Sequence, residues 1–229
     1  MTSGATTAAH LALAPQFERQ SGAPVRTLAT STGLGATSIA SRVRRGEAVD
    51  IVMLSRAALD ELAADGSVLA ASVTDLARSS VGVAVRVGAP KPDISTVAAL
   101  RETLLRARSI AVSPQVSGVY LTTELFPQLG IAAEMAAKTR RVDQGRVASV
   151  VARGEVELAF QQISELREVP GVEIVGPLPA EVQRVTVFSA AIVAASPQPD
   201  AARAYLAFWR SPAGIRAIVD SGLELIAPR

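Results

Sequence analysis

Arg45-Gly46-Glu47-Ala48-Val49-Asp50-Ile51-Val52 and Arg153-Gly154-Glu155-Val156-Glu157-Leu158-Ala159-Phe160 share one short pattern, which occurs twice in the chain. In both copies an amphipathic stretch precedes Arg-Gly-Glu, and apolar residues typical of a buried strand follow. The copies lie 108 positions apart, far beyond the period of about 20 to 50 residues of solenoid repeats. The pattern therefore predicts two similar lobes, and an interface between lobes is a common place for a small ligand.

The composition is that of a folded protein with a large core. Of the 229 residues, 49% are hydrophobic, 19% are charged and 3% are aromatic, and the formal net charge is +2. These values exclude a disordered chain. The basic residues are scattered rather than clustered, so we expect no nucleic-acid partner. The chain contains no cysteine and no zinc, phosphate-loop or nucleophile-elbow motif, so we expect neither a metal nor a cofactor.

Two features bear on the compartment of the protein. No apolar run approaches the roughly 18 residues that a membrane span needs. The first residues, Met1 to Ala5, carry neither a basic nor an apolar segment of a signal peptide. We therefore expect either a mature, trimmed chain or a cytoplasmic one.

Helical patterns alternate with short apolar strands along the chain, which predicts an α/β protein. In the first part we expect a strand over 25–30, a helix over 34–45 and a strand over 50–54. A long apolar strand over 185–195 could return the chain to the first lobe, and two C-terminal helices over 200–210 and 212–221 follow it.

Several polar turns fall between a strand and a helix. They are Ser3-Gly4, Thr30-Ser31-Thr32-Gly33, Ser117-Gly118 and Gln144-Gly145-Arg146. Backbone N–H groups at a helix start, with a hydroxyl beside them, suit an anion. For any single turn, a simple role as helix cap or turn former is the more common one. Ligands of open α/β sheets nevertheless bind outside the carboxyl ends of strands, where these turns are expected.

Three tracts carry a resemblance to a known family. They are Gly46 to Met53 with the following Ala58 to Leu62, the tract Ser109 to Tyr120, and Arg153 to Ser164. They resemble the periplasmic molybdate-binding proteins of ABC transporters, in the type II periplasmic binding protein superfamily, and the resemblance covers nearly the whole chain. It implies two α/β lobes, each a mixed sheet flanked by helices, joined by two crossover segments. Lobe 1 would comprise 1–80 with 190–229, lobe 2 would comprise 81–189, and the ligand cleft would lie between them.

Further stretches are similar to the branch of this family that includes aconitate isomerase. These are 76–86, 117–127 and 160–166. Interconversion of cis- and trans-aconitate needs a proton removed and returned. His10, Tyr120, Glu124 and Glu165 are acid or base candidates, although their spacing forms no specific catalytic constellation, so we predict no catalytic residue from the pattern alone.

The resemblance also implies a set of ligand contacts. The family's ligand loops fall on Ser3, Gly4, Ser31, Thr32, Ser117, Gly118, Val119, Tyr120, Arg146, Val147, Gln161 and Gln162. The tyrosine of the family's pocket is replaced by Gln162, so a phenol gives way to an amide that both donates and accepts. Family members also have a strand before the first turn, whereas here the turn starts at the third residue, so we expect a weakened sheet in lobe 1.

The resulting prediction is a monomeric solute-binding protein that closes by a hinge over a small anion, molybdate or tungstate or a di- or tricarboxylate. Its partner would be the permease of an ABC transporter, and the resemblance implies a periplasmic location. The alternative is an aconitate isomerase on the same scaffold. A ligand-sensing domain of a LysR-type regulator shares the fold but normally follows a helix-turn-helix, and none precedes Met1 here.

Overall fold

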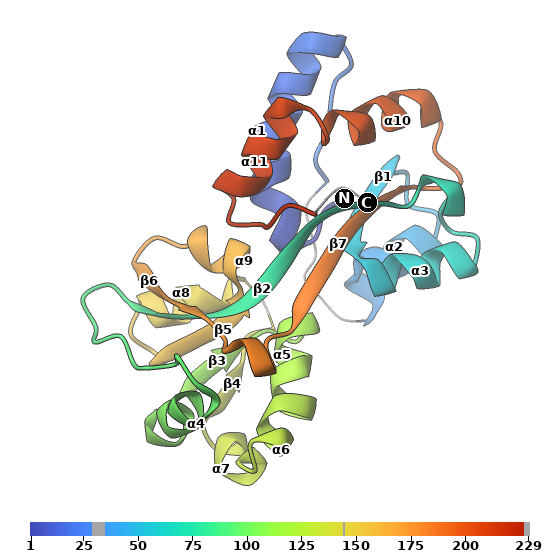
Figure 1. The fold of residues 1–229 in the computed structure, drawn as a ribbon. Coiled ribbons are helices and arrows are strands. Elements are labelled where there is room, and N and C mark those ends of the chain that lie inside the picture. Colours follow the sequence, from blue (N-terminus) through green and yellow to red (C-terminus); the bar gives the residue numbers. More distant parts are fainter. Residues whose placement is uncertain (29–34, 144, 227–229) are drawn as a thin grey trace. The chain divides into compact units, whose positions relative to one another are not determined.

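The computed structural model describes residues 1–28, 35–143 and 145–226. The chain divides into two compact units: unit 1 contains Met1–Ser79 and Thr186–Arg229, and unit 2 contains Ser80–Val185. Strands β2 (Thr74–Arg86) and β7 (Val185–Ile192) cross the two boundaries, so the units are linked through these two strands (Figure 1). The predicted α/β fold with two crossover segments is confirmed.

Unit 1 is built from both ends of the chain. Its elements besides β2 and β7 are α1 (Gly4–Ser21), the three-ten helix Gly35–Thr37, α2 (Ile39–Arg44), β1 (Ile51–Ser55), α3 (Arg56–Ala64), the three-ten helix Ala70–Ser72, α10 (Pro199–Phe208) and α11 (Pro212–Asp220). β1 pairs with β7 in antiparallel register from Ile51↔Ile192 to Ser55↔Phe188. On the other edge of β1, Thr2 forms an isolated parallel bridge with Met53. The first residues thus extend this sheet by a single bridge.

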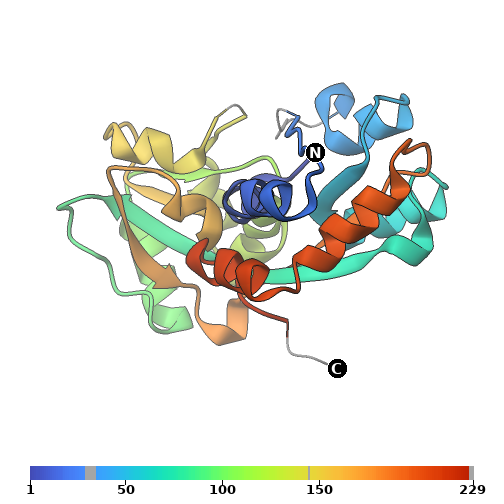
Figure 2. The ribbon, with the colours of Figure 1, turned by 90° about the horizontal axis from the view of Figure 1, so that it is seen from above.

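Helices cover both faces of the unit 1 strands because alternate residues of a strand point to opposite faces. Met53, Ala190 and Ile192 belong to the core beneath α1, α10 and α11. Val52 and Ala191 belong to the core beneath α2 and α3. Helices α1 and α11 lie side by side in both ribbon views (Figures 1 and 2). The two predicted C-terminal helices are confirmed.

Unit 2 contains a five-stranded mixed sheet in the order β6-β2-β5-β3-β4. Its further elements are α4 (Val97–Arg106), β3 (Ile110–Val112), α5 (Val116–Tyr120), the π-helical turn Leu121–Leu125, α6 (Phe126–Gln128), α7 (Ala132–Ala136), β4 (Thr139–Arg141), α8 (Val147–Ala152), β5 (Leu158–Gln162), α9 (Ile163–Arg167), β6 (Val172–Pro177) and the three-ten helix Ala180–Val182. β2 is antiparallel to β5 and β6, whereas β5, β3 and β4 run parallel. Three carboxyl strand ends therefore meet at one edge.

The two faces of the unit 2 sheet differ in residue size. One face carries bulky residues such as Ile110 and Phe160, which pack with α4, the tract from α5 to α7, and β2. The other face carries Ala84, Ala111 and Ala159, against which α8 and α9 pack. Because alanine has a short side chain, these two helices can approach the strands closely.

The repeated Arg-Gly-Glu pattern ends a helix in each unit with the same hydrogen bonds. Gly46 has φ +76° and Gly154 has φ +74°, a left-handed conformation that glycine adopts without steric cost. In unit 1, Gly46 N donates to Val43 O and Glu47 N donates to Arg42 O; in unit 2, Gly154 and Glu155 make the same pair of bonds to Val151 and Val150. This is the Schellman cap.

Three expected elements differ in the structure. The strand predicted over 25–30 is not a strand over its described residues 25–28; Val25 N instead donates to the Glu18 carboxylate at 2.6 Å. The helix predicted over 34–45 is shorter, because Ser38 caps α2 by accepting a hydrogen bond from Ser41 N. The return strand ends at Ile192 rather than at 195. The residues over 25–30 have a high propensity for β-strands, but a strand forms only where a neighbouring strand pairs with it through hydrogen bonds.

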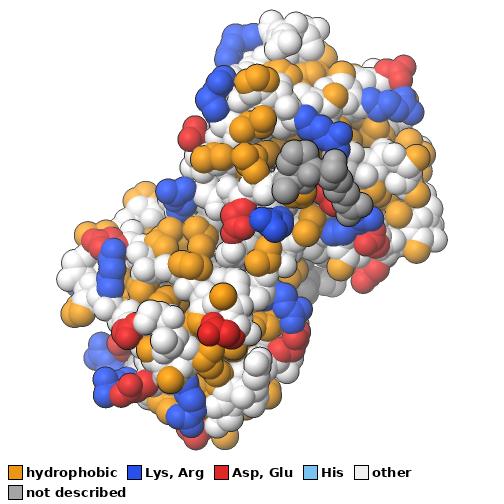
Figure 3. Space-filling model, viewed as in Figure 1, with side chains coloured by type: hydrophobic (Ala, Val, Ile, Leu, Met, Phe, Trp, Pro, Cys, Tyr) orange, Lys and Arg blue, Asp and Glu red, His pale blue; other side chains and the backbone are white. Residues whose placement is uncertain are grey.

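The surface is mixed in character. On the face drawn in Figure 3, Lys and Arg side chains alternate with Asp and Glu and with apolar side chains, without a broad area of one charge. Among the described residues, no helix is long and apolar enough to cross a membrane.

Candidate functional site

The carboxyl ends of three parallel strands in unit 2 form the candidate site. Ile110↔Leu158 and Val112↔Phe160 fix the register of β3 with β5, and Val112↔Arg141 fixes its register with β4. Each strand leads into a helix, β3 into α5 and β4 into α8 through a short connection, and β5 directly into α9. In open α/β sheets this edge is where ligands bind.

The turn after β3 places two serine hydroxyls beside each other. Ser113 and Ser117 are buried, and their Oγ atoms lie 3.4 Å apart. Ser113 Oγ also accepts a hydrogen bond from Gln115 N at 3.3 Å. The predicted ligand residue Ser117 thus lies on the first turn of α5, where backbone N–H groups and hydroxyls favour a negative charge.

Position 118 requires glycine because α5 approaches the backbone of Ser113 closely there, and not because the residue has a positive φ. A Cβ built on Gly118 would lie 1.7 Å from Ser113 O, so any side chain would push α5 away from the end of β3. We expect Gly118→Ala to reduce the free energy of unfolding by about 1 to 3 kcal/mol, the usual cost of overpacking a tight contact. The measurement is urea unfolding followed by circular dichroism.

Gly176→Ala is the matched control for this substitution. A Cβ on Gly176 would meet only Ile94 Cδ1, at 3.9 Å, which is ordinary van der Waals distance. Both variants add one methyl group to unit 2. Equal stabilities of the two variants would contradict the close approach of α5 to Ser113.

Two glutamines end strand β5. Gln161 and Gln162 are both buried, and Gln162 is the residue from which α9 begins. Gln161 Nε2 donates a hydrogen bond of 2.5 Å to a carboxylate oxygen of Glu165, four residues further on. The strand end and the first turn of α9 are therefore tied together through side chains.

The turn before α8 contributes a cation to the same edge. The guanidinium of Arg146 forms an ion pair with Glu168, whose side chain is 14% exposed while that of Arg146 is 45% exposed. Burial raises the pKa of Glu165 to about 7, and the positive charge of Arg146 acts in the opposite direction. Arg146, Gln161, Glu165 and Glu168 thus form one polar group, which we call the α8–α9 polar cluster.

The remaining predicted contacts of unit 2 have other partners. Val147 is buried in the core beneath α8, and Val119 N donates to Gln115 O within α5. Tyr120 donates its phenol proton to Val182 O at 2.6 Å, and its ring carries the guanidinium of Arg184 at 4.5 Å. Tyr120 is therefore joined to the chain after β6, while Ser117, Arg146, Gln161 and Gln162 lie at the three strand ends.

In unit 1, Ser3 and Gly4 begin α1. Ser3 N donates to Met53 O at 2.8 Å, and Ser3 Oγ lies 3.2 Å from Thr6 Oγ1. Because Thr2 pairs with Met53 in parallel, Ser3 follows a short strand pairing, as the polar turns of unit 2 do. Ser31 and Thr32 lie outside the described residues.

The other acid and base candidates are engaged elsewhere. His10 is buried in α1 between Tyr205 Oη and Thr27 Oγ1, each 2.7 Å from one ring nitrogen. Burial, together with the charge of the N-terminal amine, lowers the pKa of His10 to about 4. Glu124 is exposed and forms an ion pair with Arg184. Of the four candidates, Glu165 is the one within the α8–α9 polar cluster.

Glu168 and Ser113 were not predicted from the sequence. Glu168 lies one helical turn after Glu165, a spacing that can place two acids on one face, but nothing in the sequence indicates that this face meets Arg146. No group of three or more metal-ligating side chains that could hold an ion is found over residues 1–28, 35–143 and 145–226.

Comparison with known proteins places this geometry in a family. Residues 1–224 match the family model of bacterial extracellular solute-binding proteins. The chain is 44% identical over 214 residues to an aconitate isomerase from a Pseudomonas species, covering 93% of this chain and 81% of that protein. The periplasmic molybdate-binding protein of Azotobacter vinelandii superposes with a TM-score of 0.79 at 20% identity, covering 100% of this chain and 98% of that one. The sulfate-binding protein of Mycobacterium tuberculosis superposes with a TM-score of 0.75 at 18% identity, covering 99% and 85%. The chain therefore belongs to the bacterial extracellular solute-binding protein family.

Proposed function

We propose that the protein binds a tricarboxylate of the aconitate type and interconverts its cis and trans isomers. The observation that carries the proposal is the 44% identity to an aconitate isomerase over 93% of the chain. The match covers most of both proteins, which supports a common substrate class. The proposed contacts are Ser117, Arg146 and Gln162 in unit 2 and Ser3 in unit 1, while the contacts proposed at Ser31 and Thr32 lie outside the described residues.

The α8–α9 polar cluster supports a carboxylate ligand. An arginine side chain has five N–H donors in a planar fork that matches a carboxylate. Arg146 uses part of this fork for Glu168, and nearly half of its side-chain surface is exposed. Aconitate carries three carboxylates at neutral pH, so a site that holds it needs cationic as well as neutral donors. Gln162 and Ser117 would supply neutral ones.

A second candidate is a carrier that delivers a small anion to an ABC transporter in the periplasm. It is favoured by the family match and by structural neighbours named as molybdate- and sulfate-binding proteins. A carrier returns its ligand unchanged, whereas an isomerase does not.

The first test is a thermal-shift screen with molybdate, tungstate, sulfate, citrate, tricarballylate, cis-aconitate and trans-aconitate. A ligand that binds only the folded state raises the melting temperature. We expect a rise with the tricarboxylates, followed by interconversion of cis- and trans-aconitate in a proton NMR assay. A rise with molybdate or tungstate alone would favour the carrier, and binding of aconitate without turnover would exclude the isomerase.

Gln162→Ala tests the predicted contact at the end of β5. We expect the variant to bind trans-aconitate more weakly by roughly 1 to 3 kcal/mol, because a buried amide that bonds a charged ligand would be lost. Isothermal titration calorimetry measures the change. Gln128→Ala, at an exposed position at the end of α6, is the control. An unchanged dissociation constant for Gln162→Ala would remove Gln162 from the site.

A further inference from the structure

Glu165 occupies a distinct chemical position within the α8–α9 polar cluster. One of its carboxylate oxygens accepts the 2.5 Å hydrogen bond from Gln161 Nε2, so the strand end fixes its orientation. The side chain is half-buried. The neighbouring acid Glu168 is held by Arg146 in an ion pair, whereas Glu165 has an amide as its hydrogen-bond partner. A carboxyl group that is oriented by an amide hydrogen bond rather than by an ion pair can exchange a proton.

The protonation of Glu165 fits such an exchange at neutral pH. Burial raises its pKa to about 7 and Arg146 lowers it, so the acid and the carboxylate are both populated. A general acid–base group works best when its pKa lies near the working pH. The charged group that acts on Glu165 is Arg146 at the start of α8, which also forms the ion pair with Glu168 after α9.

Building on the proposed isomerase function, we propose that Glu165 is the catalytic base that moves the proton of aconitate. Its carboxylate takes one proton from the methylene carbon of the substrate. The electron pair of that C–H bond forms a new double bond to the central carbon, and the former double bond becomes a carbanion at the other end, delocalised into the adjacent carboxylate. The carboxyl group of Glu165 then returns the proton to that end. The product is again a propene tricarboxylate, and the new double bond can have the other geometry.

This step is balanced without a metal, a cofactor or a second reactant. One C–H bond breaks and one forms, and the double bond moves by one carbon. Glu165 is a carboxylate again at the end of the step. Because the same group must act first as base and then as acid, both of its forms must be accessible within one turnover. Gln161 is then a positioning residue, since its amide holds the carboxylate that transfers the proton.

The variant Glu165→Gln tests the role directly. The glutamine oxygen can still accept the hydrogen bond from Gln161, so we expect folding and binding of trans-aconitate within about threefold of the original protein. We expect kcat for cis-to-trans conversion to fall at least about 100-fold, the lower end of what general acid–base catalysis contributes. Glu102→Gln is the control, because Glu102 is an exposed acid paired with Arg106 on α4, and its kcat should not change.

The pH profile gives a second readout that a merely structural role would not produce. In the original protein kcat/KM should rise as pH increases through about 7, because the base must be ionised. Glu165→Asp should keep a reduced activity with such a rise. Arg146→Gln should move the rise to higher pH, since the charge that favours the ionised form would be gone.

The outcomes separate this role from the function on which it rests. If the unmodified protein binds trans-aconitate without converting it, both the proposed isomerase function and the proposed role of Glu165 are excluded. An active original protein with an active Glu165→Gln variant would remove only the role of Glu165. Loss of activity in Glu165→Gln with binding retained, beside a fully active Glu102→Gln, would support both.

Discussion

Arg146→Gln is expected to raise the dissociation constant for trans-aconitate about 10- to 100-fold. A hydrogen bond to a charged group is worth about 1.5 to 3 kcal/mol, and every 1.4 kcal/mol corresponds to a factor of about ten. Arg146 is the N-cap residue of α8, at the end of the turn that follows β4, and its side chain is 45% exposed. Part of its guanidinium therefore remains accessible to bond an incoming carboxylate.

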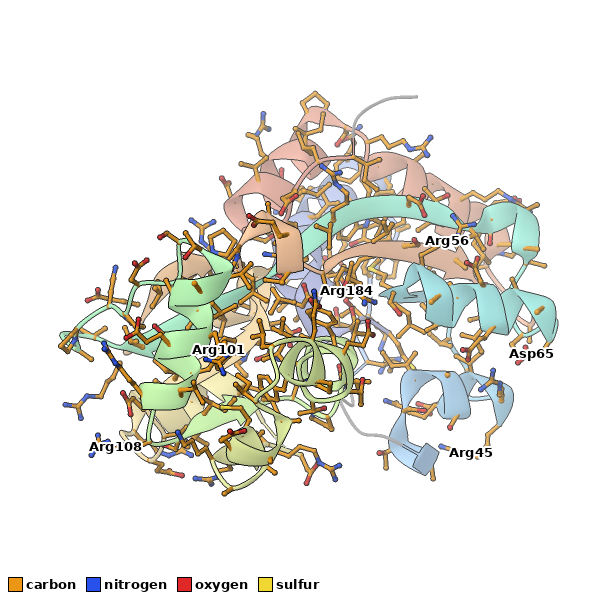
Figure 4. The ribbon with its side chains drawn as sticks, turned by 60° about the horizontal axis from the view of Figure 1, so that its bottom comes forward. Arg45, Arg56, Asp65, Arg101, Arg108 and Arg184 are labelled. Carbon is orange, nitrogen blue, oxygen red and sulfur yellow. The ribbon has the colours of Figure 1, made fainter. Side chains whose placement is uncertain are left out.

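The control for this substitution is Arg108→Gln. Arg108 also lies in unit 2 and also bonds an acid, Glu157, but its side chain is 91% exposed and projects outward beyond α4 (Figure 4). Both variants lose one positive charge, so a general effect of net charge would appear in both. Titration calorimetry at two salt concentrations separates a specific contact from long-range attraction. Equal dissociation constants for the two variants would remove Arg146 from the site.

Lowering the pH from 7.5 to 5 is expected to reduce the free energy of unfolding by about 2 kcal/mol through His10 alone. The pKa of His10 is about 4 in the folded protein, and its ordinary value is 6.5. Below pH 6.5 the unfolded chain binds a proton that the folded chain does not, so stability falls as pH falls. The loss reaches about 3 kcal/mol near pH 4, from 1.36 kcal/mol per pKa unit.

His10→Gln isolates this contribution. Glutamine does not titrate and can still bond Tyr205 or Thr27, the two partners of the imidazole. Urea unfolding at pH 7.5 and pH 5 should show that the variant loses about 2 kcal/mol less stability than the original protein over that interval. Two parallel stability curves would show that the imidazole takes up its proton in the folded state as readily as in the unfolded one.

Sequence reasoning was most reliable where a local pattern has one structural solution. The two Arg-Gly-Glu motifs end helices with identical Schellman caps in separate units. The two C-terminal helices were also predicted, and in the structure each has a proline in its first turn. The prediction of a strand over 25–30 was wrong for residues 25–28. A high strand propensity does not by itself provide the neighbouring strand with which these residues would have to pair.

The candidate site was predicted in part. The turns at Ser117 and Arg146 and the end of β5 at Gln162 were identified from the polar residues between strands and helices and from the family resemblance. The predicted role of each as a ligand contact stays a prediction. Tyr120 shares the loop of Ser117, yet its hydroxyl is bonded to Val182 O, a partner 62 residues away that no local pattern indicates.

The sequence by itself determined the order of helices and strands, the caps that end α2 and α8, and the polar turns at which an anion could bind. Only the tertiary structure decided that Arg146, Gln161, Glu165 and Glu168 form one cluster. Arg146 follows β4 whereas the other three follow or end β5, and β3 lies between those strands in the sheet. The meeting of these side chains, and the burial that raises the pKa of Glu165, depend on the parallel register and on the close packing of α8 and α9 over alanines. These are contacts between distant parts of the chain, and local propensity carries no information about them.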